Sequence, residues 1–307
     1  MKTILLATDK PFSKDAVASI RQVVENSGNR LELLEGYTDK AELLKAVSEV
    51  DAMIVRSDLI TAEVLEAAKK LKIVVRAGAG YDNIDTKIAK EKGVVVMNTP
   101  GQNSNAVAEL VFGMMVYVAR GFYDGKTGTE LRGKKLGIHA YGYVGKLVAE
   151  VAKGFGMELF AFDPFISDDV IAKDGITPVH SAEELYAVCD YVSLHIPAND
   201  KTKKSINYDL LTRLPKGATL VNTARKEVID EEGLKRVFAD RPDFKYVSDV
   251  APDCHAELTE AYKNRYYSTP KKMGAQTNEA NVNAGIAAAK QIADFFATGN
   301  TTFQVNK

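Results

Sequence analysis

The sequence predicts an α/β protein built from two doubly wound parallel-sheet domains. Apolar, β-branched strand segments alternate with amphipathic helical segments almost throughout the chain. The alternation runs through two series, the second of which begins near residue 136. Buried parallel strands need helices on both faces of the sheet, and such an alternation supplies them. A length of 307 residues also fits about two domains.

The first series contains five expected strands, in the segments KTILLATD, LELLEG, AMIVRS, KIVVRAG and VVVMNTP. Helical segments separate them, for example residues 61–70, in which Thr61 is the expected N-cap. We expect this part of the chain, residues 1–98, to form a flavodoxin-like domain.

The second series contains six expected strands, in the segments LGIHA, ELFAFDP, YVSLHIP, ATLVNTA, FKYVSDV and YYSTP. Residues 181–184 (SAEE) read as a capping box that opens the helix before YVSLHIP. Long, largely apolar helices are expected at 103–120 and 278–297, where the two series meet. If the latter returns to the first domain, residues 99–275 form an inserted Rossmann domain within a domain of residues 1–98 plus 276–307.

Composition and charge exclude several classes of function. The formal net charge of −1 gives no electrostatic reason to bind nucleic acid or an anionic membrane. Two cysteines, Cys189 and Cys254, provide no disulfide framework and suit a reducing compartment. The chain has no apolar run long enough for a signal peptide or a membrane span, and no residue spacing typical of a metal site. We therefore expect a cytoplasmic protein without a metal ion.

The turn AYGYVG at residues 140–145 follows one expected strand and opens a helix. Small residues at Ala140, Gly142 and Gly145 allow a tight turn and let a pyrophosphate approach the N–H groups of a helix N-terminus. Asp163 ends the next strand, 18 residues after Gly145, where a carboxylate binds the adenosine ribose of NAD and repels the 2′-phosphate of NADP. The alternative is an ordinary glycine-containing βα turn. The segment expected to contact NAD is Ala140, Gly142, Tyr143, Val144 and Gly145.

Several longer segments resemble one enzyme family in the family's own order. They include VVRAGAGYDNID (74–85), GVVVMNTPGQNSNAVAEL (93–110), LPKGATLVNTARKEVIDEEGL (214–234) and TPKKMGAQTNEANVNAG (269–285). Together they resemble the D-2-hydroxyacid dehydrogenases, most closely their D-3-phosphoglycerate dehydrogenase branch. The resemblance implies NAD as cofactor, a small 2-hydroxy acid as substrate, and a homodimer formed through helix 104–119. Because the chain ends at FQVNK, we expect the appended regulatory domains of longer relatives to be absent.

Oxidation of a 2-hydroxy acid needs a cation that holds the carboxylate and polarises the C2 oxygen. Arg225 follows the strand ATLVNTA, and ligands bind at the carboxyl ends of such strands. A guanidinium binds a carboxylate through a planar fork. By resemblance Arg225 matches the family's catalytic arginine; the alternative is an ion-paired surface arginine.

The reaction also needs a base, and here the chain departs from the family pattern. The position of the family's catalytic histidine holds Lys272, and that of its carboxylate partner holds Cys254. A lysine has an ordinary pKa of about 10.4, which must fall toward neutrality for base catalysis. A nearby Arg225 and partial burial would lower it, whereas a carboxylate would raise it, so the two replacements are chemically coherent. Lys271 is the second candidate, and a solvated lysine pair in a loop is the alternative to both.

Resemblance also implies contacts around the nicotinamide and the substrate. The expected cofactor contacts beyond the turn and Asp163 are His195, Pro197, Thr223, Ala224 and Asp249. The expected substrate contacts are Arg56, Ser57, Arg76, Ala77, Gly78 and Asn103, with Asn98 as a further polar candidate. Arg56 is a good partner for a phosphate, and the N–H groups of the glycine-rich turn after Arg76 suit a carboxylate. His255 is a less favoured base, and His139 is expected to be structural.

The sequence thus predicts NAD-dependent oxidation of 3-phospho-D-glycerate to 3-phosphohydroxypyruvate, the entry to serine synthesis, with two domains that close on the substrate and exclude water. One alternative is another enzyme of the family, a D-lactate dehydrogenase or a glyoxylate/hydroxypyruvate reductase. A second alternative is a non-catalytic, NADH-sensing protein like the C-terminal-binding-protein corepressors. Loss of the family histidine would fit the second alternative, whereas retention of Arg225 argues against it.

Overall fold

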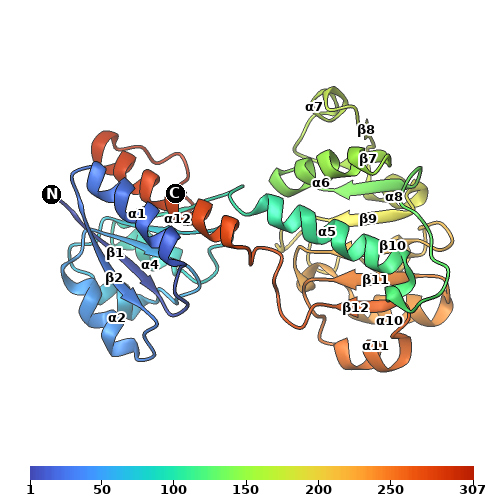
Figure 1. Ribbon diagram of the computed structural model, residues 1–307, viewed down its shortest axis with the longest axis horizontal. Helices are drawn as coiled ribbons and strands as arrows, with labels where there is room; N and C mark the ends of the chain where they lie inside the picture. The colour runs from blue at the N-terminus through green and yellow to red at the C-terminus, as the bar shows by residue number, and fades with distance from the viewer. The chain divides into compact units, whose positions relative to one another are not determined.

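The computed structural model describes residues 1–307, which divide into two compact units. Unit 1 comprises Met1–Asn103 and Gln276–Lys307, and unit 2 comprises Ser104–Ala275. Each unit contains one parallel β-sheet with helices on both faces (Figure 1). The predicted fold class, two doubly wound α/β domains, is confirmed.

The sheet of unit 1 has the strand order β2-β1-β3-β4-β5, and every pair is parallel. Its strands are β1 (Thr3–Thr8), β2 (Arg30–Glu35), β3 (Ala52–Val55), β4 (Ile73–Arg76) and β5 (Val95–Asn98). The chain moves outward from β1 to β2 and then returns to the other side of β1. This reversal makes the carboxyl ends of β1 and β3 the topological switch point, where open α/β sheets bind ligands.

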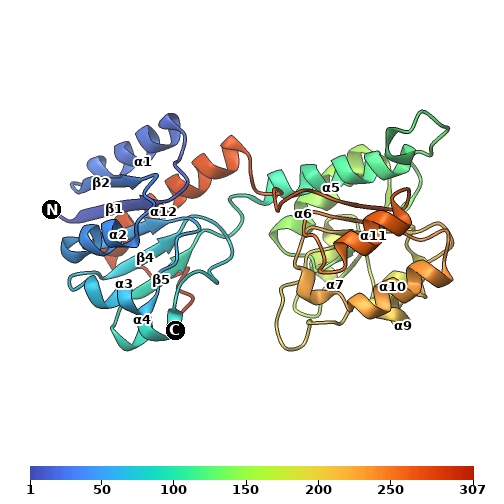
Figure 2. The ribbon, with the colours of Figure 1, turned by 90° about the horizontal axis from the view of Figure 1, so that it is seen from below.

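Two groups of helices cover the two faces of this sheet (Figure 2). One face packs against α1 (Lys14–Asn26) and α12 (Asn278–Thr298). The other packs against α2 (Lys40–Ala46), α3 (Ala62–Ala67) and α4 (Thr86–Glu91), with the 3-10 turn η1 (Val47–Glu49) after α2. A side chain on Gly285 of α12 would lie 2.6 Å from Ile20 of α1, so the glycine permits close helix packing.

The sheet of unit 2 has seven parallel strands in the order β12-β11-β10-β9-β6-β7-β8. They are β6 (Lys135–His139), β7 (Glu158–Phe162), β8 (Thr177–Pro178), β9 (Tyr191–Leu194), β10 (Thr219–Asn222), β11 (Lys245–Ser248) and β12 (Tyr266–Ser268). The chain first extends from β6 to β8 and then continues on the other side of β6. The switch point of this sheet therefore lies between β6 and β9.

Helices also cover both faces of the second sheet. The face that buries Ile138, Val221 and Val247 packs against α5 (Ser104–Ala119) and α6 (Tyr143–Gly154), and Figure 1 shows α5 crossing the sheet. The opposite face packs against α8 (Ala182–Val188), α9 (Tyr208–Leu211), α10 (Glu231–Asp240) and α11 (His255–Tyr262). The remaining elements are α7 (Asp168–Lys173), η2 (Gly121–Tyr123) and η3 (Lys226–Val228).

Two local predictions differ from the structure. Thr61 is the residue before α3, but its hydroxyl is buried and binds nothing in the protein, and the helix ends at Ala67 rather than at residue 70. Ser181 caps α8 by accepting from the N–H of Glu184, as predicted. However, the Glu184 carboxylate accepts from His180 N rather than from Ser181 N, so the capping box is shifted by one residue.

No helix of the structure combines the length and the apolar character that a membrane crossing requires.

Candidate active site

The predicted nucleotide-binding turn lies at the switch point of unit 2, between the end of β6 and the start of α6. Ala140 has a φ of 84°, in the left-handed region that favours glycine, and its N–H donates to Phe162 O at 2.9 Å. Helix α6 begins after Gly142, which offers no side chain to cap it. The first N–H groups of α6 are therefore free to bind an anion.

The two glycines of the turn have different structural roles. A Cβ on Gly145 would lie 2.4 Å from Ala140 O, so only glycine allows the helix to pack this closely against the turn. A Cβ on Gly142 would meet no atom within 4 Å. The protein itself therefore does not require glycine at 142, whereas a phosphate approaching the backbone would.

Asp163 follows β7 and holds this turn from one side. Its Oδ2 accepts from Tyr141 N at 2.8 Å, and its Oδ1 accepts from Phe165 N at 2.8 Å. Each carboxylate oxygen can accept a second hydrogen bond. The arrangement fixes the carboxylate beside the turn with acceptor capacity left for a ribose hydroxyl.

Two buried polar atoms at adjacent strand ends have no hydrogen-bond partner in the protein. They are Nε2 of His195, after β9, and Oγ1 of Thr223, after β10. Burial lowers the pKa of His195 to about 3 and that of His139 to about 4, so both rings are neutral near pH 7. Unsatisfied buried polar atoms are rare and fit a polar ligand at this edge. His139 is buried beside Tyr186, as expected for a structural residue.

The two predicted catalytic cations meet at one main-chain oxygen. Arg225 Nη1 donates to Ala224 O at 2.9 Å, and Lys272 Nζ donates to the same oxygen at 3.3 Å. Lys272 comes from the loop after β12, 48 residues away in sequence. Both Lys272 and Lys271 are exposed, so unit 2 does not provide the partial burial that was expected for Lys272.

Asp249 anchors the loop that carries Lys272. Its carboxylate is buried and accepts from Met273 N at 2.8 Å and from Gly274 N at 2.7 Å. The Thr269 hydroxyl lies 2.9 Å from the same carboxylate. A Cβ on Gly274 would lie 2.8 Å from Asp249 Oδ2, which explains the glycine. The sequence pointed to Asp249 as a cofactor contact and gave no sign of this anchoring.

Cys254 stands where the family has a carboxylate, and another acid binds the main chain at this position. Glu231, in the first turn of α10, accepts from the N–H groups of Asp253 at 2.7 Å and Cys254 at 2.9 Å. Burial first, and then Glu231, raise the pKa of Cys254 to about 12, so its thiol is protonated and unreactive. His255 is the first residue of α11, and its Nδ1 lies 2.8 Å from Tyr266 Oη.

At the switch point of unit 1, uncharged groups hold the side chain of Arg56. Arg56 donates to Lys10 O at 3.0 Å and to Asn281 Oδ1 at 2.8 Å, and its guanidinium lies 4.9 Å from the centre of the Phe12 ring. Burial lowers the pKa of Arg56, although Asp58 acts in the opposite direction. The exposed Ser57 hydroxyl donates to Asp9 at 3.3 Å.

The glycine-rich turn after β4 differs from the expected carboxylate site. The N–H of Ala77 donates to Val55 O at 2.8 Å, and that of Gly78 donates to the Thr99 hydroxyl at 2.6 Å. These two groups are therefore not free donors. The N–H groups of the next two residues, Ala79 and Gly80, make none of the hydrogen bonds found in the structure. Ala79 and Gly80 therefore replace Ala77 and Gly78 as the candidate donors to a carboxylate.

Three further residues were predicted to lie near this turn, and their contacts differ. They are Arg76, Asn98 and Asn103. Arg76 Nε donates to Arg56 O at 3.0 Å, and its guanidinium occupies the space that a side chain on Gly78 would need. Asn98 donates to Ala79 O at 2.6 Å and so shapes the turn. Asn103 is half-buried at the end of the first segment of unit 1. These contacts leave the substrate roles of Arg76 and Asn103 as predictions.

Sequence comparison identifies the family. Residues 5–306 match the family model "D-isomer specific 2-hydroxyacid dehydrogenase, catalytic domain". The chain belongs to this family.

Proteins similar to this dehydrogenase include two enzymes with different names. A D-3-phosphoglycerate dehydrogenase of Methanocaldococcus jannaschii is 36% identical over 94% of this chain and 56% of its own length. A hydroxypyruvate reductase of Thermotoga maritima is 35% identical over 92% of this chain and 95% of its own. The chain thus spans about half the length of the former relative and nearly all of the latter.

Among solved structures, the NAD⁺-bound 3-phosphoglycerate dehydrogenase of Entamoeba histolytica superposes with a TM-score of 0.90. The two sequences are 46% identical, and the superposition covers 100% of this chain and 99% of the Entamoeba histolytica chain. The family prediction and the prediction of a dehydrogenase are confirmed. The cofactor predicted from the turn, NAD, is the one bound in that structure.

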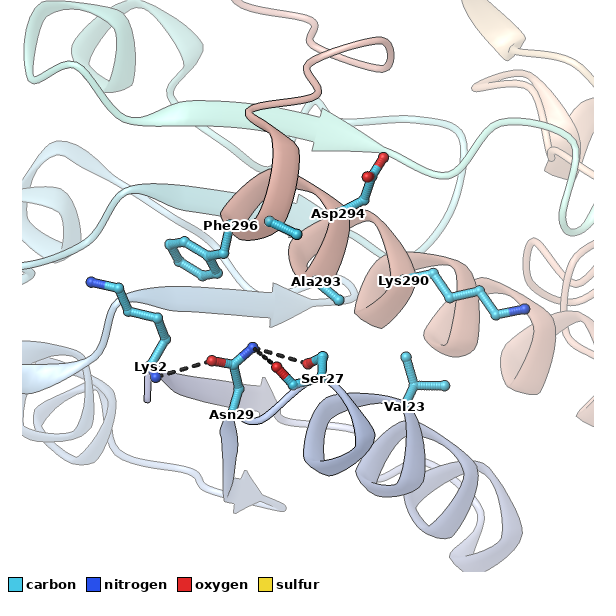
Figure 3. A pocket seen from close by; sticks show the side chains of 9 residues that line it. Lys2, Val23, Ser27, Asn29, Lys290, Ala293, Asp294 and Phe296 are labelled. Carbon is cyan, nitrogen blue, oxygen red and sulfur yellow. Dashed lines mark hydrogen bonds between the residues drawn. The ribbon is translucent and has the colours of Figure 1, made fainter.

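One groove of the dehydrogenase lies away from both switch points. It measures about 570 Å³ and lies between α1 and α12 of unit 1, near the amino ends of β1 and β2 (Figure 3). Asn29 lies at one end, where it accepts from Lys2 N and donates to Ser27, and Lys290 lies at the other. The groove contains no residue predicted for the site, and the amino edge of a parallel sheet is opposite to the edge that binds ligands.

Proposed function

We propose that this dehydrogenase oxidises 3-phospho-D-glycerate to 3-phosphohydroxypyruvate with NAD. The observation that carries the proposal is the convergence of Arg225 and Lys272 on Ala224 O, at the carboxyl edge of the sheet that bears the nucleotide-binding turn. One residue can bind a carboxylate and the other can carry a proton. The 46% identity with a 3-phosphoglycerate dehydrogenase supports the choice of substrate.

The residues of unit 2 fit NAD. The uncapped start of α6 and the open space at Gly142 suit a pyrophosphate, and Asp163 keeps acceptor capacity for a ribose. His195 Nε2 and Thr223 Oγ1 are buried groups that need partners, as the nicotinamide end would provide. We assign Tyr143, Val144, Pro197, Ala224 and Asp249 to the same site by resemblance. When bound, NAD supplies the acceptor for the hydride that leaves C2.

In the proposed reaction the protein positions the acid and moves one proton. The Arg225 guanidinium holds the carboxylate and polarises the C2 oxygen. Lys272 Nζ takes the hydroxyl proton as the C2–H bond breaks and C2 becomes a carbonyl carbon. In the reverse direction Lys272 returns the proton to the carbonyl oxygen. A protonated lysine cannot act as a base, so oxidation requires its neutral form.

We assign recognition of the acid's other end to unit 1. Arg56 uses two of its five N–H donors within the protein, which leaves three for a phosphate. Ser57 is the other candidate donor to the phosphate, and the free N–H groups of Ala79 and Gly80 are candidate donors to the carboxylate. Asp9 and Asp58 lie close to Arg56 and restrict where an anion can bind, because they repel it.

The second candidate function is hydroxypyruvate reduction. It is favoured by the Thermotoga maritima relative, which this chain matches over 95% of that protein's length. The chemistry at Arg225 and Lys272 would be the same. The two candidates differ in whether a phosphate contributes to substrate binding.

The test is NADH oxidation with 3-phosphohydroxypyruvate, hydroxypyruvate and glyoxylate as alternative substrates. We expect kcat/KM to be at least about 100-fold higher for the phosphorylated acid, which corresponds to two contacts of about 1.4 kcal/mol each. Equal values for the two acids would contradict phosphate recognition and favour the reductase. Binding of NADH without turnover of any 2-keto acid would favour the non-catalytic alternative.

Two variants test the proposed base. Lys272→Arg keeps a cation but removes a group that can be neutral, and Lys272→Ala removes both. Each should lower kcat by at least about 100-fold while the Kd for NADH stays within about threefold. Lys271→Ala is the matched control and should retain activity. Near-normal kcat in Lys272→Arg would rule out base catalysis by this residue.

We further propose a cytoplasmic homodimer formed through α5. Leu110, Val116 and Tyr117 on this helix are only half-buried in the single chain, which leaves apolar surface for a partner. The molar mass in solution, measured by light scattering, tests this; a monomer at all concentrations would contradict it.

A further inference from the structure

Asn222, the last residue of β10, is wholly buried and was not among the residues that the sequence pointed to. Its side chain folds over the loop that follows the strand. The Oδ1 atom accepts from Ala224 N at 2.9 Å, and the Nδ2 atom donates to Arg225 O at 3.1 Å. The Asn222 amide therefore binds the main chain on both sides of the Ala224 carbonyl.

A hydrogen-bond network fixes the Asn222 side chain itself. Its Nδ2 donates also to Tyr246 Oη at 3.2 Å, and Tyr246 is fully buried in β11. Burial raises the pKa of Tyr246 to about 12, so its hydroxyl keeps its proton. The main-chain oxygen of Asn222 accepts from Asp249 N at 2.9 Å. Both ends of the residue are thus tied to the neighbouring strand.

The Ala224 carbonyl is the point at which the two proposed catalytic side chains meet. Arg225 Nη1 and Lys272 Nζ both donate to its oxygen. A shift of this carbonyl would move both cations, and a displacement of about 1 Å in an active site is enough to reduce rate by about 100-fold. A group that holds this peptide in place therefore also sets the distance between Arg225, which binds the acid, and Lys272, which transfers the proton.

We infer that Asn222 is a positioning residue for the reaction: its side-chain amide fixes the Ala224–Arg225 peptide and thereby places Arg225 and Lys272 relative to each other. This inference rests on the proposed function of those two residues. It goes beyond that function because Asn222 touches neither substrate nor cofactor in the scheme. The side-chain amide is needed in full, since the oxygen and the nitrogen each hold a different part of the loop.

The test replaces the amide by a carboxylate of the same shape. Asn222→Asp keeps an acceptor for Ala224 N but loses the donor to Arg225 O and to Tyr246 Oη. We expect kcat to fall by about 10- to 100-fold, with the Kd for NADH within about threefold of wild type. If this variant does not fold, Asn222→Ser is measured instead, because its hydroxyl is too short to span the loop, and the same loss is expected.

Asn306→Asp is the matched control. Asn306 is also buried, and its side chain also binds main chain on both sides, by accepting from Val96 N at 2.9 Å and donating to Val94 O at 2.8 Å. It belongs to unit 1, at the amino end of β5. We expect a comparable loss of thermal stability and a kcat within about twofold of wild type. An Asn222 variant that behaves in the same way, with near-normal kcat, would overturn the inference.

A second measurement separates this inference from the proposed function. Oxalate, a small dicarboxylate, is titrated calorimetrically into the NADH-loaded protein, so that Arg225 is probed without turnover. We expect wild type to bind oxalate and Asn222→Asp to bind it at least about tenfold more weakly. Wild type that binds oxalate but reduces no 2-keto acid would refute the function alone. Equal oxalate binding by both proteins would refute the positioning role alone, and no binding by wild type would refute both.

Discussion

The carboxyl edges of the two sheets are built differently, although each lies at a switch point of a parallel sheet. In unit 1, Arg56, Asp58 and Asp9 are engaged with each other or with neighbouring main chain. In unit 2, the start of α6 is uncapped and two buried polar atoms, on His195 and Thr223, have no protein partner. At the first edge the side chains already have protein partners, although Arg56 keeps unused donors, whereas the second edge has buried polar atoms with no protein partner at all.

This difference agrees with the ligands that we propose for the two units. A dinucleotide presents the same pyrophosphate and ribose to every protein, so a backbone turn with fixed glycines is sufficient. A small acid is distinguished by its side groups, so its site depends on side chains whose partners vary. We therefore expect substitutions at the edge of unit 2 to affect all substrates equally, and those at the edge of unit 1 to discriminate between substrates.

The largest effect is expected at the two glycines of the nucleotide-binding turn. Gly145→Ala places a Cβ 2.4 Å from Ala140 O and should lower both stability and NADH affinity, the latter by more than about 100-fold. Gly142→Ala meets no protein atom and should fold normally while NADH affinity falls at least about tenfold. Fluorescence titration with NADH and thermal melting separate the two outcomes.

Gly154→Ala serves as the control for both glycine variants, since Gly154 ends the same helix and a Cβ there meets nothing within 4 Å. It should bind NADH like wild type. Undiminished NADH binding by Gly142→Ala would show that no phosphate approaches this backbone.

The loss of stability that histidine protonation causes should arise in unit 2, because all four histidines, at 139, 180, 195 and 255, belong to it. The pKa of His139 is about 4 in the folded protein and about 6.5 when unfolded. Between these values the unfolded state binds the additional proton, so stability falls as the pH decreases through this window. His139 alone is expected to contribute a loss of roughly 2 kcal/mol at about pH 5 relative to neutral pH. His195, whose pKa is lowered to about 3, is expected to contribute a similar loss.

Urea unfolding at neutral pH and at about pH 5 measures this loss. His139→Gln should show a smaller acid-induced decrease than wild type. His180→Gln is the control, because His180 is exposed, and its decrease should match wild type. An unchanged decrease in His139→Gln would contradict the assignment.

The sequence was sufficient to predict the sheets and the tight turn between β6 and α6. Strands alternate with helices in a regular way, and Gly145 is required by close packing of the helix against the turn, which the spacing of small residues in AYGYVG indicates. The convergence of Arg225 and Lys272 was predicted only in part. Resemblance placed both residues in the site, but the shared acceptor, Ala224 O, depends on two loops that are distant in sequence.

Other features depend on three-dimensional contacts that no local pattern reveals. Asp249 was predicted to contact the cofactor, yet it also binds the loop of Lys272 through Met273 and Gly274. Ala77 and Gly78 were predicted to donate to a substrate, but a neighbouring strand and Thr99 already accept from them. The sequence often shows that a side chain lies at the carboxyl edge of a sheet. Its hydrogen-bond partners can be identified only from the three-dimensional structure.

A moderate effect is expected at Arg56, and it tests whether the edge of unit 1 discriminates. Arg56→Met should raise the KM for the phosphorylated acid by about tenfold, because a charged hydrogen bond of about 1.4 kcal/mol is lost. The KM for hydroxypyruvate should not change. Arg21→Met, at a half-buried arginine paired with Glu25 in the same unit, is the control. Equal changes for both acids would mean that Arg56 only supports the fold through Lys10 and Asn281.

The smallest effect is expected at Ala140, whose φ of 84° is unfavourable for any residue with a Cβ. Ala140→Gly removes a strain of about 1–2 kcal/mol, and the extra freedom of glycine in the unfolded chain offsets part of this gain. The net stabilisation should be about 0.5–1 kcal/mol, a rise of roughly 1–4 °C in Tm. Ala152→Gly, the same change inside α6, should lower Tm instead, because glycine is unfavourable in a helix. If both variants lower Tm, the turn tolerates Ala140 without strain, and the glycine usual at this position serves the ligand rather than the fold.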